Sequence, residues 1–249
     1  MSRTHDRHHG GYIEDQREFF DRLVTDDWEQ YSNPAWNRAR EKEVNEIFSI
    51  VGDQVKTVLD VGCGCGYHDR VIASRPGVES VLGVDYSPQS VLQAEKHYAH
   101  PKVKRIALDV FDKEATAPYR KQFDLVVSFA VIEHLTNAKA FLNIKKSFVK
   151  DGGYVAIMTP NWKRLENRVR SAFGMKYGFC DPLHYKEYSL PDMRQMGEEC
   201  GLQFAGAFGH TYHFMLKRFT LLNCSWGFSY RRFPTLVNLA NFIGVVFKA

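Results

Sequence analysis

From residue 55 onward, short apolar runs alternate along the chain with stretches whose apolar positions have helical spacing. Five of these runs predict strands, at residues 55–60, 80–85, 103–108, 123–129 and 154–159. The runs are nearly continuous, as expected when helices cover both faces of a parallel sheet. Helices are predicted between the strands, at residues 68–73, 88–98 and 138–149, with Ser87 and Asn137 as N-caps.

Two further helices are predicted before the first strand. Residues 14–24 have helical spacing, and Asn33 followed by Pro34 predicts the start of a helix that runs to about residue 50. One side of this second helix is apolar, so we expect it to pack against the sheet. Residues 1–53 are therefore predicted to form a helical cap on a core at residues 54–160.

The alternation breaks after the fifth strand, where residues 161–188 combine aromatic and basic positions and predict an insertion or lid. The later elements are predicted in the order helix, strand, two short helices around Gly227, and strand, at residues 189–200, 203–208, 211–241 and 242–247. We expect a single domain over residues 1–249, whose C-terminal part, residues 189–249, carries the helical insertion 211–241.

A glycine-rich turn follows the first predicted strand. The sequence VLDVGCGCG places Gly62, Gly64 and Gly66 at alternate positions before a predicted helix. Glycines let the backbone turn tightly and approach a ligand without a Cβ, so this strand, turn and helix predict a nucleotide-type site. The dinucleotide pattern GxGxxG needs a glycine where Tyr67 stands, which counts against a nicotinamide-dependent oxidoreductase.

Polar residues stand at the ends of the next predicted strands. Ligands of parallel α/β sheets bind beyond the carboxyl ends of the strands, and Asp85 ends the second strand. A carboxylate at this point can accept hydrogen bonds from both hydroxyls of a ribose. Asp109, with Val110 beside it, ends the third strand, where an acid can accept from an adenine amino group.

Composition narrows the class of protein. The chain has 249 residues, 44% hydrophobic and 25% charged, as in ordinary soluble globular domains. Five cysteines without paired CxxC spacing argue against a disulfide framework and against zinc. No apolar run reaches the roughly 18 residues of a membrane span, and the first residues do not resemble a signal peptide. We therefore expect a cytoplasmic protein.

The net charge of +4 is unevenly distributed. No acidic residue follows Glu199, whereas five cations do: Lys217, Arg218, Arg231, Arg232 and Lys248. This basic end predicts either peripheral contact with an anionic membrane surface at its inner face, or a solvated face or homodimer interface. The sequence leaves these alternatives open.

Five segments in register resemble the successive motifs of class I S-adenosylmethionine (SAM) methyltransferases: VLDVGCGCG, GVDYS, LDV, FDLVVSFAVIEHL and KDGGYVAIMTPN. They span residues 55–161. The segment HYKEYSLPDMRQMGEECGL is similar to the branch that holds ubiquinone-biosynthesis, sugar and natural-product O-methyltransferases. The resemblance implies a Rossmann-like α/β fold with a seven-stranded sheet of order 3-2-1-4-5-7-6, the last strand antiparallel and helices on both faces.

The resemblance also implies SAM as methyl donor and S-adenosylhomocysteine (SAH) as product. The residues that we expect to bind this cofactor follow the predicted strands, apart from one arginine in the second helix. They are Asp60, Gly62, Cys63, Gly64, Gly66, Asp85, Tyr86, Asp109, Val110, Ser128, Phe129 and Arg38.

Catalytic residues are expected after the fourth strand and in the insertion. Glu133 and His134 match the family's Glu-His pair, but the third acid that helps hold a divalent metal in quinone O-methyltransferases is Ala130 here. Because hard cations want about six ligands, we predict that no metal is required. His184 is the first candidate for general base and His134 the second. Expected acceptor-binding residues are Tyr12, Tyr31, Trp36, Asn161 and Tyr185.

The sequence thus predicts O-methylation of a small-molecule, sugar or lipid-linked acceptor by in-line transfer, assisted by a histidine base. N-methylation of a small molecule and SAM binding without catalysis remain alternatives. Nucleic acid is not an expected partner, because the D/N-P-P-Y motif of adenine-type DNA methyltransferases is replaced by FAVIEH.

Overall fold

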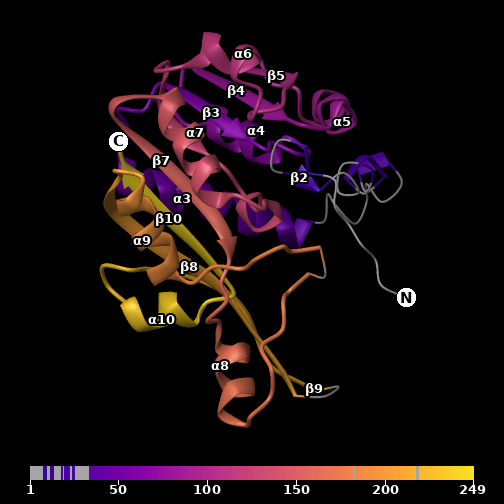
Figure 1. The fold of residues 1–249 in the computed structure, drawn as a ribbon, viewed down its shortest axis with the longest axis vertical. Helices are drawn as coiled ribbons and strands as arrows, with labels where there is room; N and C mark the ends of the chain where they lie inside the picture. Colours follow the sequence, from indigo (N-terminus) through magenta and orange to yellow (C-terminus); the bar gives the residue numbers. More distant parts are fainter. Residues whose placement is uncertain are drawn as a thin grey trace.

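The computed structural model describes residues 8–9, 12–13, 18, 20–22, 24–25, 34–181, 183–216 and 219–249. Their main feature is a mixed eight-stranded sheet of order β5-β4-β3-β6-β7-β10-β8-β9 (Figure 1). Its strands are β3 (Thr57–Val61), β4 (Ser80–Asp85), β5 (Val103–Ala107), β6 (Phe123–Val127), β7 (Val149–Pro160), β8 (Gln203–Leu216), β9 (Phe219–Ser229) and β10 (Phe242–Lys248). Strands β1 (His8–His9) and β2 (Tyr12–Ile13) pair separately.

Most helices of the described chain begin where the sequence predicts. They are α3 (Pro34–Val51), α4 (Tyr67–Ala73), α5 (Pro88–Tyr98), α6 (Lys113–Thr116), α7 (Ala138–Phe148), α8 (Leu165–Ala172), α9 (Leu190–Glu199) and α10 (Pro234–Leu239), with 3-10 turns at Ala117–Tyr119 and Ile132–His134. Ser87 and Asn137 accept hydrogen bonds from backbone N–H groups of the first turns of α5 and α7, which confirms both N-caps. The described residues between 18 and 25 are helical, as predicted.

A hydrophobic core lies on each face of the sheet. Helices α3 and α4 bury Phe48 and Ile72 against one face. Helices α7 and α9 bury Phe141 and Met193 against the other. The prediction of helices on both faces is therefore confirmed, and burial on two sides explains the continuous apolar runs of the central strands.

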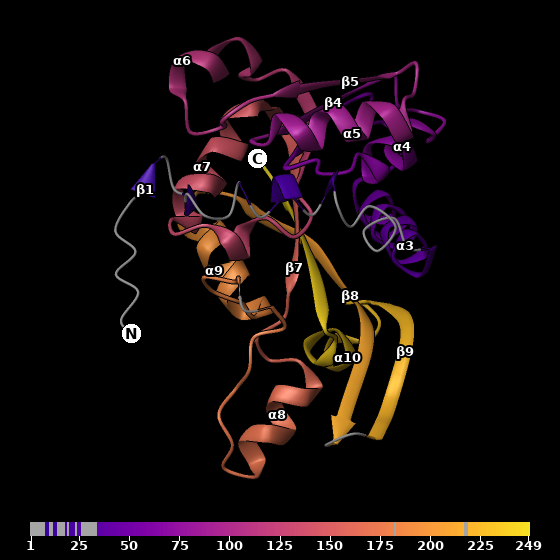
Figure 2. The ribbon, with the colours of Figure 1, turned by 90° about the vertical axis from the view of Figure 1, so that its right-hand side faces the viewer.

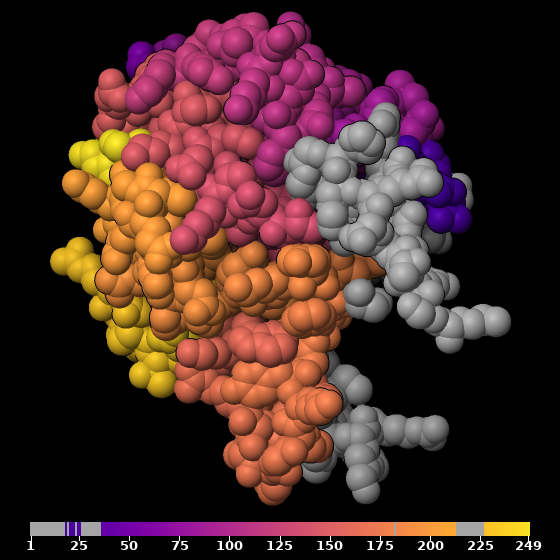
Figure 3. All heavy atoms as spheres, in the orientation of Figure 1, coloured from indigo at the N-terminus to yellow at the C-terminus, as the bar shows by residue number. Residues whose placement is uncertain are grey.

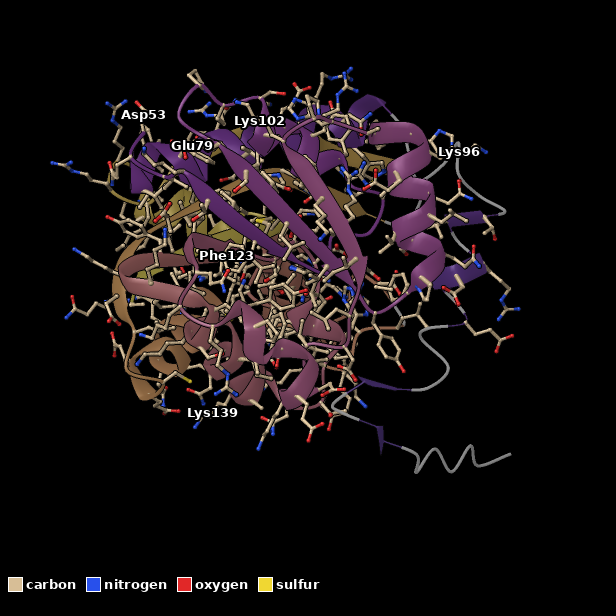
Figure 4. All side chains as sticks on the ribbon, turned by 90° about the horizontal axis from the view of Figure 1, so that it is seen from above. Asp53, Glu79, Lys96, Lys102, Phe123 and Lys139 are labelled. Carbon is tan, nitrogen blue, oxygen red and sulfur yellow. The ribbon has the colours of Figure 1, made fainter. Side chains whose placement is uncertain are left out.

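Five neighbouring strands, β5, β4, β3, β6 and β7, run parallel. Asp53, Glu79, Lys102 and Phe123 lie at or just before the start of four of them, on one side of the sheet (Figure 4). The carboxyl ends of these strands therefore meet at the opposite edge. Residues that follow β3, β4, β5 and β6 come together there, although they are far apart in sequence.

The predicted strand order is confirmed for seven strands, but the strand count is wrong. Strand β10 is antiparallel to β7 and to β8, between which it lies, as expected for the last strand. The additional strand is β9, which pairs antiparallel with β8 and forms the edge of the sheet.

The prediction of two short helices at residues 211–241 is wrong as well. This stretch contains the rest of β8, the whole of β9 and one short helix, α10. Its many aromatic residues and threonines favour strands, and pairing within a long hairpin satisfies the backbone hydrogen bonds of both segments. Most apolar residues of this stretch therefore belong to strands and not to helices.

Helix α8 and the far ends of β8 and β9 extend from the core in the same direction (Figure 2). In the space-filling view, the segment that contains α8 forms a protrusion at the lower end of the molecule (Figure 3). Within the described part of the chain, none of the helices combines the length and the hydrophobicity needed to span a membrane.

Candidate active site

A cavity of about 620 Å³ opens at the carboxyl edge of the parallel strands. It is lined by residues from the loops after β3, β4, β5 and β6, from α3 and α4, and from the segment after α8. Eleven residues that the sequence analysis selected line it: Trp36, Gly62, Cys63, Gly64, Asp85, Tyr86, Val110, Phe129, Glu133, His134 and His184. The structure thus brings most of the predicted site into one cavity.

The loop after β3 has the tight shape that its glycines allow. Gly62 has φ of 80°, and a Cβ at this position would lie 2.4 Å from Val131 Cγ2. The N–H groups of Gly62 and Cys63 donate to the carbonyl of Val84, at 2.8 and 3.0 Å. Gly64 N–H donates to Asp85 Oδ2 at 2.9 Å, so the loop and the end of β4 are joined directly.

Arg105 of β5, which the sequence analysis did not identify, holds this loop in place. Its guanidinium has no exposed surface, and its Nε donates to Asp69 Oδ2 at 2.8 Å. Its Nη2 donates to the carbonyl of Gly66 at 3.1 Å. Gly66 has φ of 76°, and a Cβ there would lie 2.7 Å from Arg105 Nε.

Asp60 lies beneath the loop and is not among the residues that line the cavity. Both of its carboxyl oxygens and Asp69 Oδ1 are buried without an ordinary hydrogen-bond partner among the described residues. Burial, with the nearby Asp69 carboxylate, raises the pKa of Asp60 well above its usual range. A proton shared between the two carboxyl groups explains how both are tolerated in the interior.

Asp85 presents a half-buried carboxyl group to the cavity. Its oxygens accept from Gly64 N–H and Ser87 N–H, both at 2.9 Å, which leaves further lone pairs for a ligand. Burial raises the pKa of Asp85 to about 6, against the effect of these two hydrogen bonds. A carboxylate held in this way beside a glycine loop fits a ribose with two hydroxyl donors.

A cluster of three side chains occupies another part of the cavity. One ligand atom each from Glu133, His134 and His184 lies within 4.8 Å of the other two. Thr159 Oγ1 donates to Glu133 Oε2 at 3.1 Å, whereas Glu133 Oε1 and His134 Nδ1 are buried without a hydrogen-bond partner in the described chain. Burial raises the pKa of Glu133 to about 7. Burial and the neighbouring His184 lower the pKa of His134 to about 4.

His184 is held by Glu187, a residue that the sequence analysis did not select. His184 Nδ1 lies 2.9 Å from Glu187 Oε1, which also accepts from Cys180 N–H at 2.6 Å. The other oxygen of Glu187 pairs with the buried guanidinium of Arg164. Burial alone would raise the pKa of Glu187, but the hydrogen bonds from His184 and Cys180 and the charge of Arg164 outweigh it and lower the pKa to about 2.

A second histidine and carboxylate pair, also not selected from the sequence, lies on the wall formed by α3 and α4. His68 Nε2 is 2.8 Å from Glu43 Oε2, and both residues line the cavity. Arg40 lines the same wall, whereas Arg38, the arginine selected from the sequence, is exposed and is not among the lining residues.

Several other selected residues lie outside the cavity lining. Asn161 is fully buried, and its Nδ2 donates to the carbonyls of Asn238 and Ala240, so it joins β7 to the end of α10. The remaining members of this group are Gly66, Asp109, Ser128 and the exposed Tyr185. Tyr31 and the side chain of Tyr12 lie outside the described residues.

The fold and the cavity define a class I SAM-dependent methyltransferase, in which a glycine loop after the first core strand and an acid after the second face a ligand at the carboxyl edge. A family model of the methyltransferase domain matches residues 33–205, and the chain belongs to this family. The expectations of fold, cofactor and enzyme class are thereby confirmed.

Known relatives agree with this class. The chain is 26% identical over 244 residues to the mitochondrial ubiquinone biosynthesis O-methyltransferase of Dictyostelium discoideum, covering 86% of this chain and 73% of the relative. Among solved structures, the methyltransferase in complex with the Haloferax volcanii Trm112 activator matches 92% of this chain and 97% of its own, with TM-score 0.64 and 16% identity. The N-methyltransferase NodS of Bradyrhizobium japonicum, solved with SAH, matches 94% of this chain and 98% of its own length, with TM-score 0.58 and 12% identity.

We expect the cofactor affinity to depend on Asp85, which lines the cavity. Replacing Asp85 by alanine should weaken SAH binding by about 1.5–3 kcal/mol, because two charge-assisted hydrogen bonds to the ribose are lost. The affinity of the unmodified protein should fall about tenfold from pH 7 to pH 5, since the accepting carboxylate is protonated below its pKa of about 6. Isothermal titration calorimetry measures both effects.

Two variants control this experiment. Asp85→Asn should lose the pH dependence, and Asp112→Asn, at the exposed N-cap of α6, should bind SAH as the unmodified protein does. Equal SAH affinities for Asp85→Ala and the unmodified protein would show that Asp85 does not hold the ribose.

Proposed function

We propose that this methyltransferase transfers the methyl group of SAM to a hydroxyl oxygen of a small-molecule, sugar or lipid-linked acceptor, with His184 as general base. The observation that carries the proposal is the pairing of His184 with the buried Glu187 at 2.9 Å, beside the unpartnered polar atoms of Glu133 and His134. The relatives named as O-methyltransferases support the choice of oxygen.

The chain contributes to the reaction mainly by positioning the cofactor and the acceptor. SAM supplies a methyl group already activated on its sulfonium. Asp85 and the glycine loop hold the cofactor at one side of the cavity. The acceptor oxygen must then lie in line, at about 3–3.5 Å from the carbon that it attacks.

The proton of the acceptor hydroxyl goes to His184 Nε2 in this proposal. With Glu187 ionised, the proton of the neutral imidazole resides on Nδ1, and Nε2 keeps its lone pair. Glu187 then stabilises the imidazolium that forms. His134 is the weaker candidate, because a pKa lowered to about 4 makes it a poor base at neutral pH.

Glu133 has a different role from the histidines. Its Oε1 has no partner in the described chain, and its pKa of about 7 lets it accept or donate a hydrogen bond near neutral pH. We infer that it orients the acceptor hydroxyl between His184 and the methyl donor. A free amine acceptor would need no strong base, so the behaviour of His184 variants separates O- from N-methylation.

Replacing His184 by alanine should lower kcat by about 10²–10⁴, because the proton acceptor is lost. Glu187→Gln should lower kcat by about tenfold or more. It should also move the acid limb of the kcat–pH profile to lower pH, since the neighbouring charge that favours the imidazolium is removed. Labelled SAM and candidate acceptor pools, with the product identified by mass, provide the assay.

Glu166→Gln is the matched control, because Glu166 lies beside the same Arg164, 4.0 Å from its Nε, but does not contact His184. It should change neither kcat nor the pH profile. An unchanged kcat in His184→Ala would exclude His184 as the base and favour an amine acceptor. If Glu187→Gln lowers kcat without shifting the kcat–pH profile, the role of Glu187 is purely structural.

The cluster of Glu133, His134 and His184 is also a candidate metal site. His184 adds a third donor beside the Glu133 and His134 pair, which the sequence analysis considered alone. Two imidazoles and one carboxylate do not supply the oxygen ligands that Mg²⁺ prefers. We therefore propose that turnover needs no magnesium, and Ala130 in place of a third acid supports this proposal.

Methyl transfer in the labelled-SAM assay should therefore survive treatment with a chelator such as EDTA. The comparison is made between untreated protein and protein dialysed against the chelator, at the same acceptor concentration. Complete inactivation that added magnesium reverses would contradict this proposal.

We also propose that the protrusion around α8 contacts an anionic membrane surface, which would suit a lipid-linked acceptor. Phe173 and Met175, directly after α8, are 77% and 46% exposed. Cations surround them in the sequence, at Lys163, Arg168, Arg170 and Lys176. Each cation near an anionic surface contributes on the order of 1 kcal/mol, and the exposed apolar side chains can enter the interface.

Co-sedimentation with vesicles measures this contact. Binding should rise with the fraction of phosphatidylglycerol in phosphatidylcholine vesicles and weaken with salt. Phe173→Ser combined with Met175→Ser should reduce it. No binding at low salt, together with a stable dimer by light scattering, would replace the membrane contact by a homodimer interface and leave the methyltransferase assignment intact.

A further inference from the structure

We propose that His68, held by Glu43, accepts a hydrogen bond from the ammonium group at the amino-acid end of the cofactor. This inference concerns the cofactor subsite only and does not depend on the acceptor. The two residues come from α4 and α3, and neither belongs to a motif that the sequence analysis used for binding.

The pair is built rigidly into the cavity wall. His68 Nε2 lies 2.8 Å from Glu43 Oε2, and the imidazole stacks on Phe129 with ring centroids 3.6 Å apart and planes 6° apart. The second oxygen of Glu43 lies 2.9 Å from Nε2 of His210, a residue of β8. The carboxylate thus lies between two histidines, and the His68 ring has little freedom to turn.

This arrangement determines which group His68 can bind. Burial alone would raise the pKa of Glu43, but the contacts with His210 and His68 lower it below its usual range, so Glu43 stays ionised. The proton of His68 then resides on Nε2, toward Glu43. Burial lowers the pKa of His68 and keeps the ring neutral. Nδ1 therefore carries a lone pair, and no other hydrogen bond of His68 is found within the described chain.

The order of the strands indicates which part of the cofactor reaches this wall. Asp85 follows β4, and Val110 follows β5, so the ribose and adenine lie over that half of the sheet. Strand β3 is the next neighbour, and β6 follows it. The rest of the cofactor must extend over the loop after β3 toward β6, where His68 and Phe129 stack.

The charges on this wall match a zwitterionic group. A lone pair on His68, backed by the ionised Glu43, favours a donor with positive charge, and Arg40 on the same wall offers a positive charge to a carboxylate. The amino-acid part of SAM and SAH carries one ammonium and one carboxylate. An acceptor phosphate or carboxylate at His68 would instead meet the negative charge of Glu43.

Two ligands separate this subsite from the rest of the cofactor pocket. SAH carries the amino-acid end, whereas 5′-methylthioadenosine has the same adenosine and no amino acid. In calorimetry, His68→Ala and Glu43→Gln should each weaken SAH binding roughly 10- to 100-fold, the loss expected for a hydrogen bond to a charged group. Neither variant should change the affinity for 5′-methylthioadenosine. Tyr67→Phe is the control, because its hydroxyl bonds Glu41 at the surface, and it should bind both ligands normally.

Nitrogen-15 spectra of histidine-labelled, unmodified protein test the contact without any substitution. SAH should shift the Nδ1 resonance of His68, and 5′-methylthioadenosine should leave it in place. Unchanged SAH affinity in both variants, an equal loss for both ligands, or an Nδ1 resonance that SAH does not move would each overturn the proposal. Because no acceptor is present, these results are independent of whether His184 acts as a base on a hydroxyl group.

Discussion

The glycine loop after β3 depends on the contacts of the buried Arg105 guanidinium. The guanidinium joins β5 to the carbonyl of Gly66 and to Asp69 in the first turn of α4. A charge without solvent exposure is tolerated only with its partners in place, so the loop, α4 and β5 hold one another in register. The loop is therefore shaped before any ligand arrives, and His68 on α4 is positioned by the same contact.

The order of the parallel strands determines which part of the cavity each group of lining residues occupies. The groups that we expect to bind adenosine follow β4 and β5, whereas the histidine cluster comes from the loop after β6 and the segment after α8. The Arg164 and Glu187 ion pair joins the two ends of the insertion that carries His184. Since Glu187 also holds His184, the position of the insertion and the orientation of the proposed base are coupled.

Two histidines of the cavity share one design, in which a buried carboxylate holds one ring nitrogen and the other nitrogen is left for a ligand. Glu187 does this for His184, and Glu43 does it for His68. Both carboxylates remain charged because hydrogen bonds outweigh the cost of burial. We assign the free nitrogen of His184 to proton transfer and that of His68 to cofactor recognition.

The sequence by itself determined the parallel core, the glycine loop and Asp85, because apolar runs, glycine spacing and caps act within a few residues. Tertiary structure decided the rest. Residues at 40 and 38 are separated by about 200° around a helix, and only packing shows that Arg40, not Arg38, faces the cavity. The partnerships of Arg105 with Asp69 and Gly66, and the pairing of β9 with β8, join segments through contacts that no local periodicity encodes.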